Sequence, residues 1–295
     1  WKDGRAWNFA RGQNPLDPEF NYLKDVDYCS GASIAIPTEL WRQLEGFDPK
    51  YRPAYCEDSD LAFRIRDRGF RTVYNPRSEV IHHEGRSHGR DTEAGIKAYQ
   101  VTNQQRLLKR WREELERDHF ANGENVFRAR DRSFGKPHIL VIDHYVPQFD
   151  KDAGSRTMFQ FLETLIESDW AVTFWPENLH YDPEYTSRIQ ELGVEVIYGS
   201  KYAGKFSDFL RSRTGLYDAV LLSRPHVAIH FIGDVRALTD ARVLYYGHDV
   251  HFERMRAQRE VAESSIEETA VEGMKRGPVV SHPAPSISTF WVVLG

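Results

Sequence analysis

The second half of the chain alternates short apolar runs with longer stretches in which apolar residues recur every three or four positions. The runs have the length of buried strands, and the longer stretches have the period of amphipathic helices. The runs that predict strands are residues 138–143, 171–175, 194–198, 218–223 and 242–246. The stretches that predict helices are residues 155–167, 183–192, 206–213 and 226–238. This alternation predicts an α/β fold with a parallel, doubly wound sheet.

The carboxyl ends of these strands are where a ligand is expected. Parallel strands bring their carboxyl ends to one edge of a sheet, and ligands bind beyond that edge. The ends of the first, fourth and fifth predicted strands lie at residues 143–145, 223–225 and 247–249. We therefore expect these three segments to surround one cleft.

The first half is less regular around a strongly patterned centre. Residues 32–36 are a short apolar stretch that predicts a strand, and residues 37–44 predict a short helix capped by Thr38. Apolar residues at helical spacing predict a second helix over residues 59–68, which Gly69 ends. The other elements expected are strands at 71–74 and 79–82 and a long amphipathic helix at 94–117.

A polar segment at residues 118–136 separates the two patterns. It contains Gly123 and Gly135 and has no sustained periodicity, which is typical of a linker. The regular pattern weakens again after residue 260. We expect a first domain at 1–117, a linker at 118–136, a second domain at 137–260 and an irregular or truncated tail at 261–295.

Composition and charge narrow the possible functions. The chain has 295 residues, of which 40% are hydrophobic and 28% charged, so we expect a buried core. The formal net charge of -5 disfavours a nucleic-acid-binding protein, which would usually show a basic face. The sequence has two cysteines, Cys29 and Cys56, which make no disulfide framework and favour a reducing compartment. The longest apolar runs are too short to cross a membrane as a helix.

Three carboxylates cluster at Glu57, Asp58 and Asp60, at the start of the second predicted helix. One interpretation is structural: Asp58 or Ser59 caps the helix, and acidic residues favour the positive end of the helix dipole. The other is catalytic, with Asp58 at the rim of a cleft as a general base for an acceptor hydroxyl. The sequence alone leaves both interpretations open.

Two further motifs are open to a functional and a structural interpretation. In the predicted strand that precedes Gly85, His82 and Glu84 share one face and His83 takes the other. One histidine can therefore be a metal ligand, or it can be a hydrogen-bonded residue at the strand end. The small residues Gly31, Ala32 and Ser33 permit close approach of a substrate to the backbone, but they also suit tight packing.

Taken in order, the motifs of the first half resemble the C-terminal half of a family 2 glycosyltransferase of the GT-A fold. The motifs are DYCSGASIAIP, GFDPKYRPAYCEDSDLAFRIRDRGF, VIHHEGRSHG and GIKAYQVTN. The resemblance implies that Asp58 is the catalytic base, that Glu57 and Asp60 shape the acceptor site, and that His82 completes the shell of a divalent metal. The residues expected around the acceptor are Gly31, Ala32, Ser33 and Tyr55. In that family the nucleotide-binding strands and the Asp-x-Asp motif that holds Mg²⁺ or Mn²⁺ lie upstream, so its main metal ligands are expected outside this chain.

The second half resembles the N-terminal domain of a family 4, GT-B type glycosyltransferase. The resemblance spans residues 136–256 and lies in ILVIDHYVPQFDKDAGSR, YDAVLLSRP and VLYYGHDVHFERM. It implies a cleft at the carboxyl edge of the sheet that contains Gly154, Ser155, His248 and Asp249. Gly154 and Ser155 open a helix whose backbone N–H groups can hold a phosphate, although each of these residues also has a purely structural interpretation.

These resemblances favour a glycosyltransferase that moves a sugar from a nucleotide-activated donor to a glycan or lipid-linked glycan, in polysaccharide or O-antigen assembly. The expected location is the cytoplasm, or the inner face of its membrane, with no nucleic-acid partner. A non-catalytic module that binds a glycan acceptor is the first alternative. A metal hydrolase built on His82, His83, Glu84 and Asp58 is the second, and tight zinc binding would favour it.

Overall fold

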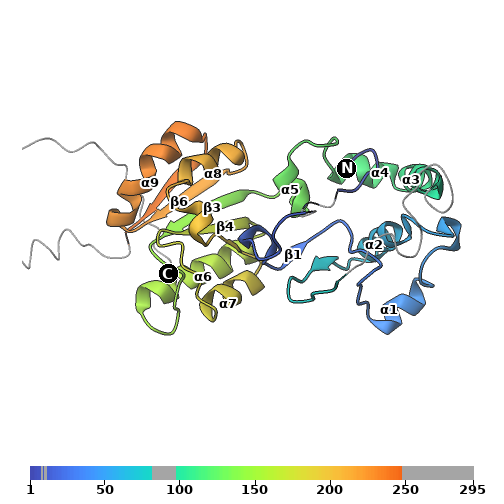
Figure 1. The fold of residues 1–295 in the computed structure, drawn as a ribbon, viewed down its shortest axis with the longest axis horizontal. Coiled ribbons are helices and arrows are strands. Elements are labelled where there is room, and N and C mark those ends of the chain that lie inside the picture. Colours follow the sequence, from blue (N-terminus) through green and yellow to red (C-terminus); the bar gives the residue numbers. More distant parts are fainter. Residues whose placement is uncertain (8, 10–11, 82–97, 248–295) are drawn as a thin grey trace, which may run out of the picture.

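The computed structural model describes residues 1–7, 9, 12–81 and 98–247, and residues 138–246 form its parallel sheet (Figure 1). The sheet has five parallel strands, as the alternating pattern predicts, and their order is β5-β4-β3-β6-β7. The strands are β3 (His138–Asp143), β4 (Ala171–Pro176), β5 (Glu195–Val196), β6 (Ala219–Ser223) and β7 (Arg242–Tyr246). The strand order reverses beside β3, so this sheet has a topological switch point between β3 and β6.

Helices cover both faces of the sheet because its strands are apolar on both sides. On β3, Ile139 and Val141 face the helices α6 and α7, whereas Leu140 and Ile142 face α8 and α9. The helices are α6 (Ala153–Glu167), α7 (Tyr185–Glu191), α8 (Phe206–Ser212) and α9 (Pro225–Leu238). The doubly wound α/β architecture predicted for this half is confirmed (Figure 1).

The first half is built mostly from helices around two small apolar clusters. Its helices are α1 (Thr38–Gln43), α2 (Glu57–Asp67), α3 (Ala98–Arg110) and α4 (Arg112–Asp118). Two-residue strands β1 (Lys24–Asp25) and β2 (Val73–Tyr74) pair antiparallel, and short 3₁₀ turns lie at Pro18–Phe20 (η1) and Pro49–Tyr51 (η2). No helix among the residues that the structure describes is long and apolar enough to cross a lipid bilayer.

Several predictions of local structure in this half are wrong. Residues 32–36 are not a strand: a turn in which Ser33 N donates to Ser30 O at 3.0 Å leads into irregular chain. Residues 79–81 are also irregular. Thr38 is the first residue of α1 and does not cap it, because the N-cap position belongs to Pro37.

The long helix expected at 94–117 is two helices in the described chain, α3 and α4, and Trp111 lies between them. The Trp111 side chain is 8% exposed, and its indole Nε1 donates to Asp60 at 2.9 Å. A further helix, α5 (Val126–Arg130), lies inside the segment expected to be a plain linker.

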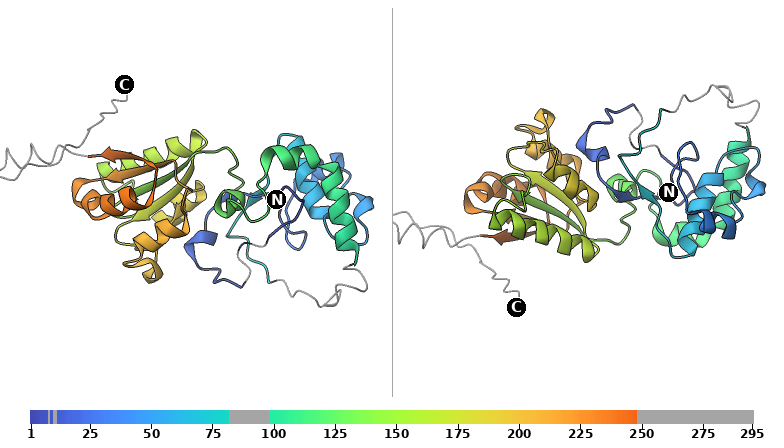
Figure 2. Two further views of the ribbon diagram at one scale, coloured as in Figure 1. Left: turned by 90° about the horizontal axis from the view of Figure 1, so that it is seen from above. Right: turned by 90° about the horizontal axis from the view of Figure 1, so that it is seen from below.

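The two halves meet through the segment that contains η1 and β1 and through α5 (Figure 2). The Leu23 backbone N–H donates to the Gln190 carbonyl at 2.9 Å. A buried ionic network lies beside it, in which Glu195 binds Arg130 at 3.0 Å and Arg213 at 2.6 Å. These three side chains are at most 3% exposed, so the junction is a packed interior rather than a loose tether.

Candidate active site

Asp58 lies in the first turn of α2 and links that helix to the turn at residues 30–33. Its Oδ1 accepts from the Ser59 backbone N–H at 2.7 Å, and its Oδ2 accepts from the Gly31 backbone N–H at 3.1 Å. The side chain is half-buried. Asp58 does not cap α2, because the N-cap residue is Cys56 and no side chain caps the helix there. Gly31, which was expected near the acceptor, is therefore held directly against the expected base.

The chain enters α2 through an unusual backbone conformation. Tyr55 and Cys56 have φ angles of 76° and 68°, in the left-handed region that residues with a β-carbon seldom adopt. Such conformations persist where the surrounding contacts enforce them. Here Asn103 does so: its Nδ2 lies 2.8 Å from the Tyr51 carbonyl, 2.7 Å from that of Ala54 and 3.1 Å from that of Tyr55.

Asn103 is a positioning residue that the sequence reasoning missed. Its side chain is fully buried, although it lies on the amphipathic helix α3. A polar residue at a buried helix position needs hydrogen-bond partners, and the carbonyls before α2 supply them. The signal was present in the sequence, because Asn103 ends the motif GIKAYQVTN.

The two other carboxylates of the cluster have different environments. Glu57 is half-buried, and burial raises the pKa of its carboxyl, to which the negative charge of Asp58 adds. Asp60 has an exposed fraction of 0%. Its carboxylate accepts from Arg64 at 2.8 Å, Tyr51 at 3.2 Å and Trp111 at 2.9 Å, and it lies 3.1 Å from Arg110.

This burial changes the role expected for Asp60. An enclosed carboxylate with that many donors cannot reach a bound acceptor; its pair with Arg64 lies within α2, and its contact with Arg110 joins α2 to α3. Tyr55, in contrast, is half-buried and Ala32 and Ser33 are exposed, so all three are accessible from solvent.

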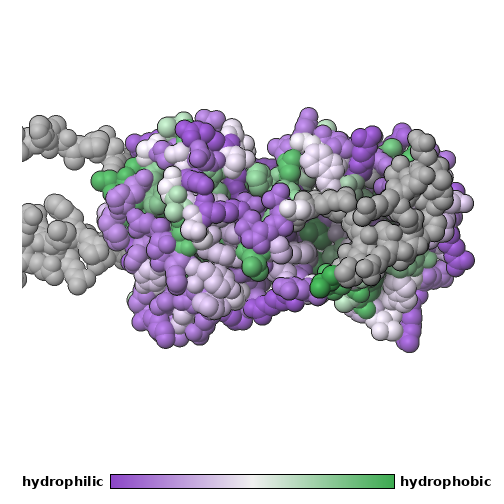
Figure 3. All heavy atoms as spheres, in the orientation of Figure 1, coloured by the Kyte–Doolittle hydropathy of each residue, from purple (hydrophilic) through white to green (hydrophobic). Residues whose placement is uncertain are grey.

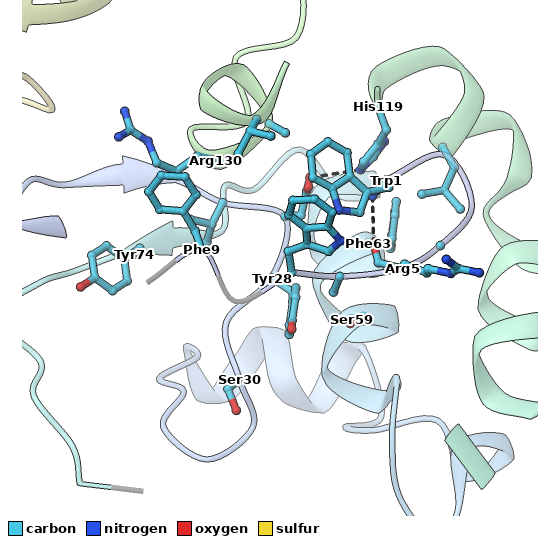
Figure 4. A pocket seen from close by; sticks show the side chains of 18 of the residues that line it. Trp1, Arg5, Phe9, Tyr28, Ser30, Ser59, Phe63, Tyr74, His119 and Arg130 are labelled. Carbon is cyan, nitrogen blue, oxygen red and sulfur yellow. Dashed lines mark hydrogen bonds and ion pairs between the residues drawn. The ribbon is translucent and has the colours of Figure 1, made fainter. Parts of the chain in front are cut away.

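A cavity of about 300 Å³ is lined in part by Ser59 of α2 and by Ser30 (Figure 4). Asp58 and Gly31, the residues next to them in the sequence, are not part of its lining, which combines aromatic, aliphatic and charged side chains. The aromatic lining residues are Trp1, Trp7, Phe9, Phe20, Tyr28, Phe63 and Tyr74. In the space-filling view the first half shows a hollow with apolar walls (Figure 3). Burial raises the pKa of the Tyr28 phenol to about 12, and the negative charge of Asp58 contributes.

The sequence reasoning did not identify this cavity. It forms because residues 1–7 and 9 fold back against α2, α4 and α5, and such long-range contacts leave no local pattern. The density of aromatic residues at Trp1, Trp7 and Phe9 was the available signal.

At the carboxyl edge of the parallel sheet, Asp143 and Arg224 form the central contact. Arg224 Nε donates to Asp143 Oδ1 at 2.8 Å, and Arg224 has a φ angle of 62°. The ring centroids of His144 and His226 lie 5.8 Å apart. The structure thus brings residues 143–145 and 223–225 together at one edge, whereas His248 and Asp249 lie outside the described residues.

The start of α6 already holds a carboxylate. Asp152 caps the helix, and its Oδ1 accepts from the Ser155 backbone N–H at 2.8 Å. Its Oδ2 accepts from the Ser155 hydroxyl at 2.6 Å and from the Tyr145 phenol at 2.9 Å. Burial alone would raise the pKa of Asp152, but these hydrogen bonds outweigh burial and lower it to about 2. The N–H of Ser155, expected to hold a phosphate, therefore already has a partner.

The described residues do not fit a resident metal. Within residues 1–81 and 98–247, apart from the masked positions 8, 10 and 11, no group of three His, Cys, Asp or Glu side chains could hold a metal ion. His82, the expected metal ligand, lies outside the described residues, as do His83 and Glu84.

Comparison with known proteins gives matches for the first half. The family model described as "Glycosyltransferase like family 2" matches residues 16–107. The N-acetylglucosaminyl-diphospho-decaprenol L-rhamnosyltransferase of Mycobacterium tuberculosis is 34% identical over 93 residues, which cover 32% of this chain and 29% of that protein. Rhamnosyltransferase WbbL of Escherichia coli is 37% identical over 65 residues, 21% of this chain and 24% of that protein.

The chain thus spans less than a third of the length of these relatives. No solved structure gives a significant match. The matched residues contain Gly31, Asp58 and Asn103, and the parallel sheet lies outside them. Residues 16–107 therefore belong to a glycosyltransferase family 2-like domain.

Proposed function

We propose that this chain belongs to an enzyme that transfers a sugar from a nucleotide-activated donor to a glycan acceptor. The observation that carries the proposal is the position of Asp58. Its carboxylate is half-buried, and two backbone N–H groups hold its oxygens in place. The next residue of the helix, Ser59, lines a cavity that contains seven aromatic side chains. Aromatic walls suit a sugar ring, which presents C–H groups on its faces and hydroxyls at its rim.

In the proposed reaction Asp58 is the general base. It takes the proton from an acceptor hydroxyl while that oxygen forms a bond to the anomeric carbon of the donor. The bond between the anomeric carbon and the nucleoside diphosphate breaks, and its electrons leave with the diphosphate. Attack from the opposite side inverts the configuration of the sugar.

The substrate classes come from the relatives. Both matched relatives are named as rhamnosyltransferases, and one name specifies a diphospho-decaprenol acceptor. We propose a nucleotide-activated deoxyhexose such as rhamnose as donor and a lipid-linked glycan as acceptor, in cell-surface polysaccharide assembly on the cytoplasmic side of the membrane. Because of the resemblance to family 2, we also propose that the enzyme uses a divalent cation, Mg²⁺ or Mn²⁺, whose ligands lie outside the described residues.

We propose further that the second half is part of a GT-B type transferase. The support is the five-stranded parallel sheet, whose strand order reverses beside the edge where Asp143 and Arg224 meet. In this view residues 1–117 are the C-terminal part of a GT-A domain and residues 137–260 are the N-terminal, Rossmann-like part of a GT-B domain. The segment 118–136 joins them and contains α5. Gly154, Ser155, His248 and Asp249 remain the proposed cleft residues of the second domain.

The aromatic cavity also supports a second candidate, a module that binds a glycan without changing it. Turnover separates the two. In the protein expressed from its complete gene, we would follow release of nucleoside diphosphate from a panel of nucleotide sugars that includes activated rhamnose. Asp58→Asn should lower kcat by about 10²–10⁴-fold, the usual contribution of a general base.

The matched control is Asp208→Asn, because the Asp208 side chain is 75% exposed on α8, and this variant should be unaffected. Full activity in Asp58→Asn would refute the assignment of the base. Glycan binding with no turnover of any donor would favour the binding module.

A further inference from the structure

The loop that carries Gly31 is attached to α2 at two points. At one end the Asp27 backbone carbonyl accepts a hydrogen bond from Arg66 of α2. At the other end the Gly31 N–H donates to Asp58 of the same helix. Residues 30–33 are exposed. Before them, the Val26 N–H donates to the Thr72 carbonyl at 3.0 Å and Cys29 Sγ lies 3.5 Å from the Val73 carbonyl, whereas the anchor at Asp27 is the one that ties this segment to α2.

The Asp27 side chain is held by residues beyond the part of the chain that matches the family 2 model. Its Oδ1 accepts from Arg132 Nη1 at 2.7 Å and lies 3.1 Å from His119 Nε2. Burial alone would raise the pKa of this carboxyl, but the His119 contact and the Arg132 charge hold it well below its usual range. The matched segment ends at residue 107, so both partners come from the region after it.

His119 also contacts α2 directly. Its side chain is 5% exposed, and its ring centroid lies 5.7 Å from that of Phe63. Phe63 in turn stacks on Trp111 at 5.0 Å and lies under the Arg66 guanidinium at 4.5 Å. The same histidine thus touches the anchor of the loop and the helix that carries Asp58, and Asp27 and His119 both line the cavity (Figure 4).

We propose that His119 and Arg132 are positioning residues, which clamp Asp27 and thereby hold the Gly31 N–H against the Asp58 carboxylate. The inference about catalysis rests on the proposed function, whereas the inference about the loop does not. The proposal gives the segment between the two halves, which has the composition of a linker, a role in the candidate active site of the first half.

The test compares Arg132→Ala and Arg132→Lys with the control Arg211→Ala. Arg132 has a φ angle of 45°, and Ala and Lys adopt that backbone conformation with similar strain, so the two variants differ in the side chain alone. The control removes an arginine that is 60% exposed and pairs only with Asp208 of its own helix among the ion pairs of the described residues. Hydrogen–deuterium exchange, resolved to the peptide that contains Gly31, reads the loop without requiring turnover.

We expect Arg132→Ala to speed exchange of the Gly31 amide by about tenfold while the strands of the parallel sheet keep their protection. Arg132→Lys should restore much of the protection, and Arg211→Ala should behave as the wild type. In activity assays Arg132→Ala should lower kcat by about 10–100-fold with little change in KM for the donor, since a misplaced base affects the chemical step. His119→Gln, which keeps one N–H donor, should retain more activity than His119→Ala.

Unchanged exchange at Gly31 in Arg132→Ala would overturn the clamp, whatever the activity of Asp58→Asn. A loss of protection spread over the whole chain, which lysine does not restore, would also overturn it, because it would identify a general stabiliser. Faster exchange at Gly31 in Arg132→Ala would keep the clamp even if Asp58→Asn were fully active, which would refute Asp58 as the base, or if no donor were turned over, which would refute the proposed function.

Discussion

The backbone N–H of Gly31 lies 3.1 Å from Oδ2 of Asp58, across a gap of 27 residues in the sequence. A side-chain carboxylate is thus tied to a loop that is otherwise exposed. A β-carbon at residue 31 would lie 3.7 Å from Phe47 Cζ and 3.8 Å from Asp58 Cβ, which are ordinary contact distances. The position therefore tolerates a small side chain, and its hydrogen-bond donor can be tested separately from its size.

Gly31→Pro and Gly31→Ala form the matched pair for this test. Residue 31 is the second residue of a turn closed by Ser33 N and Ser30 O, a position that proline favours. Proline should therefore keep the turn but remove the N–H donor. We expect glycosyl transfer to fall by about tenfold or more in Gly31→Pro and to stay near the wild-type rate in Gly31→Ala. Equal rates in the two variants would show that the hydrogen bond does not matter.

Asp60→Asn should destabilise the protein. Asp60 is fully buried and pairs with Arg64, whose side chain is 13% exposed, so its loss removes the counter-charge of a mostly buried arginine, whereas Arg110 keeps Asp48 at 2.8 Å. Breaking a buried ion pair by removing one partner costs about 3–5 kcal/mol in the free energy of unfolding. Denaturant titration measures this change, and Asp208→Asn, at an exposed position of α8, should stay within about 0.5 kcal/mol of the wild type. A neutral Asp60→Asn variant would contradict the structural role.

Lys24 should make stability depend on pH. Burial lowers its pKa from 10.5 to about 8 in the folded chain. Between pH 8 and pH 10.5 the unfolded chain binds a proton at Lys24 that the folded chain does not bind. The free energy of unfolding therefore rises with pH over this range. Below pH 8 Lys24 is protonated in both states, and the full cost of burying its charge is present. The free energy of unfolding of the wild type, relative to Lys24→Met, should therefore rise from pH 8 to pH 9.5. A difference that stays flat or falls over this range would refute the prediction.

Asp152 should stabilise the second half through its charge as well as its hydrogen bonds. Asn caps helices about as well as Asp, so Asp152→Asn can keep the bond to the Ser155 N–H while it removes the charge and one acceptor oxygen; the pH dependence of the difference then reports the charge. Because the folded pKa is lowered to about 2, the charge contribution is present above pH 3.8 and is lost as pH falls toward 2. The wild type should therefore exceed Asp152→Asn in stability at pH 7, and the difference should narrow at pH 3. A difference independent of pH would exclude the charge effect.

The sequence predicts the parallel sheet well, because β3, β4, β5 and β6 are mostly buried and alternate along the chain with amphipathic helices. The predicted bounds of β3 and β7 agree with the structure, and both are apolar runs between polar or turn residues. The predictions for the first half fail for a different reason. Ile34 and Ile36 were read as a strand, yet they pack on Leu40 and Leu61 from irregular chain, so burial alone did not indicate a strand.

The break between α3 and α4 also could not be read from periodicity. The apolar spacing continues through Trp111, and only its hydrogen bond to the buried Asp60 shows why the chain turns there. The sequence motifs predict Asp58 and Gly31 as residues of the candidate site. They do not predict the cavity or the contacts of Asp27, because these are formed by segments far apart in the sequence.

The contact between Glu195 and two arginines has a consequence for how such a protein can be divided. Arg130 comes from the short helix between the halves, Arg213 follows α8, and Glu19 of the first half lies 3.8 Å from Arg213. Cutting the polypeptide anywhere between residues 20 and 130 and discarding the front piece would remove Glu19, a counter-charge of the buried Arg213 in the rear piece. The two halves are thus interleaved, and an exchange of modules between proteins of this kind would have to carry the sheet and its N-terminal segment together.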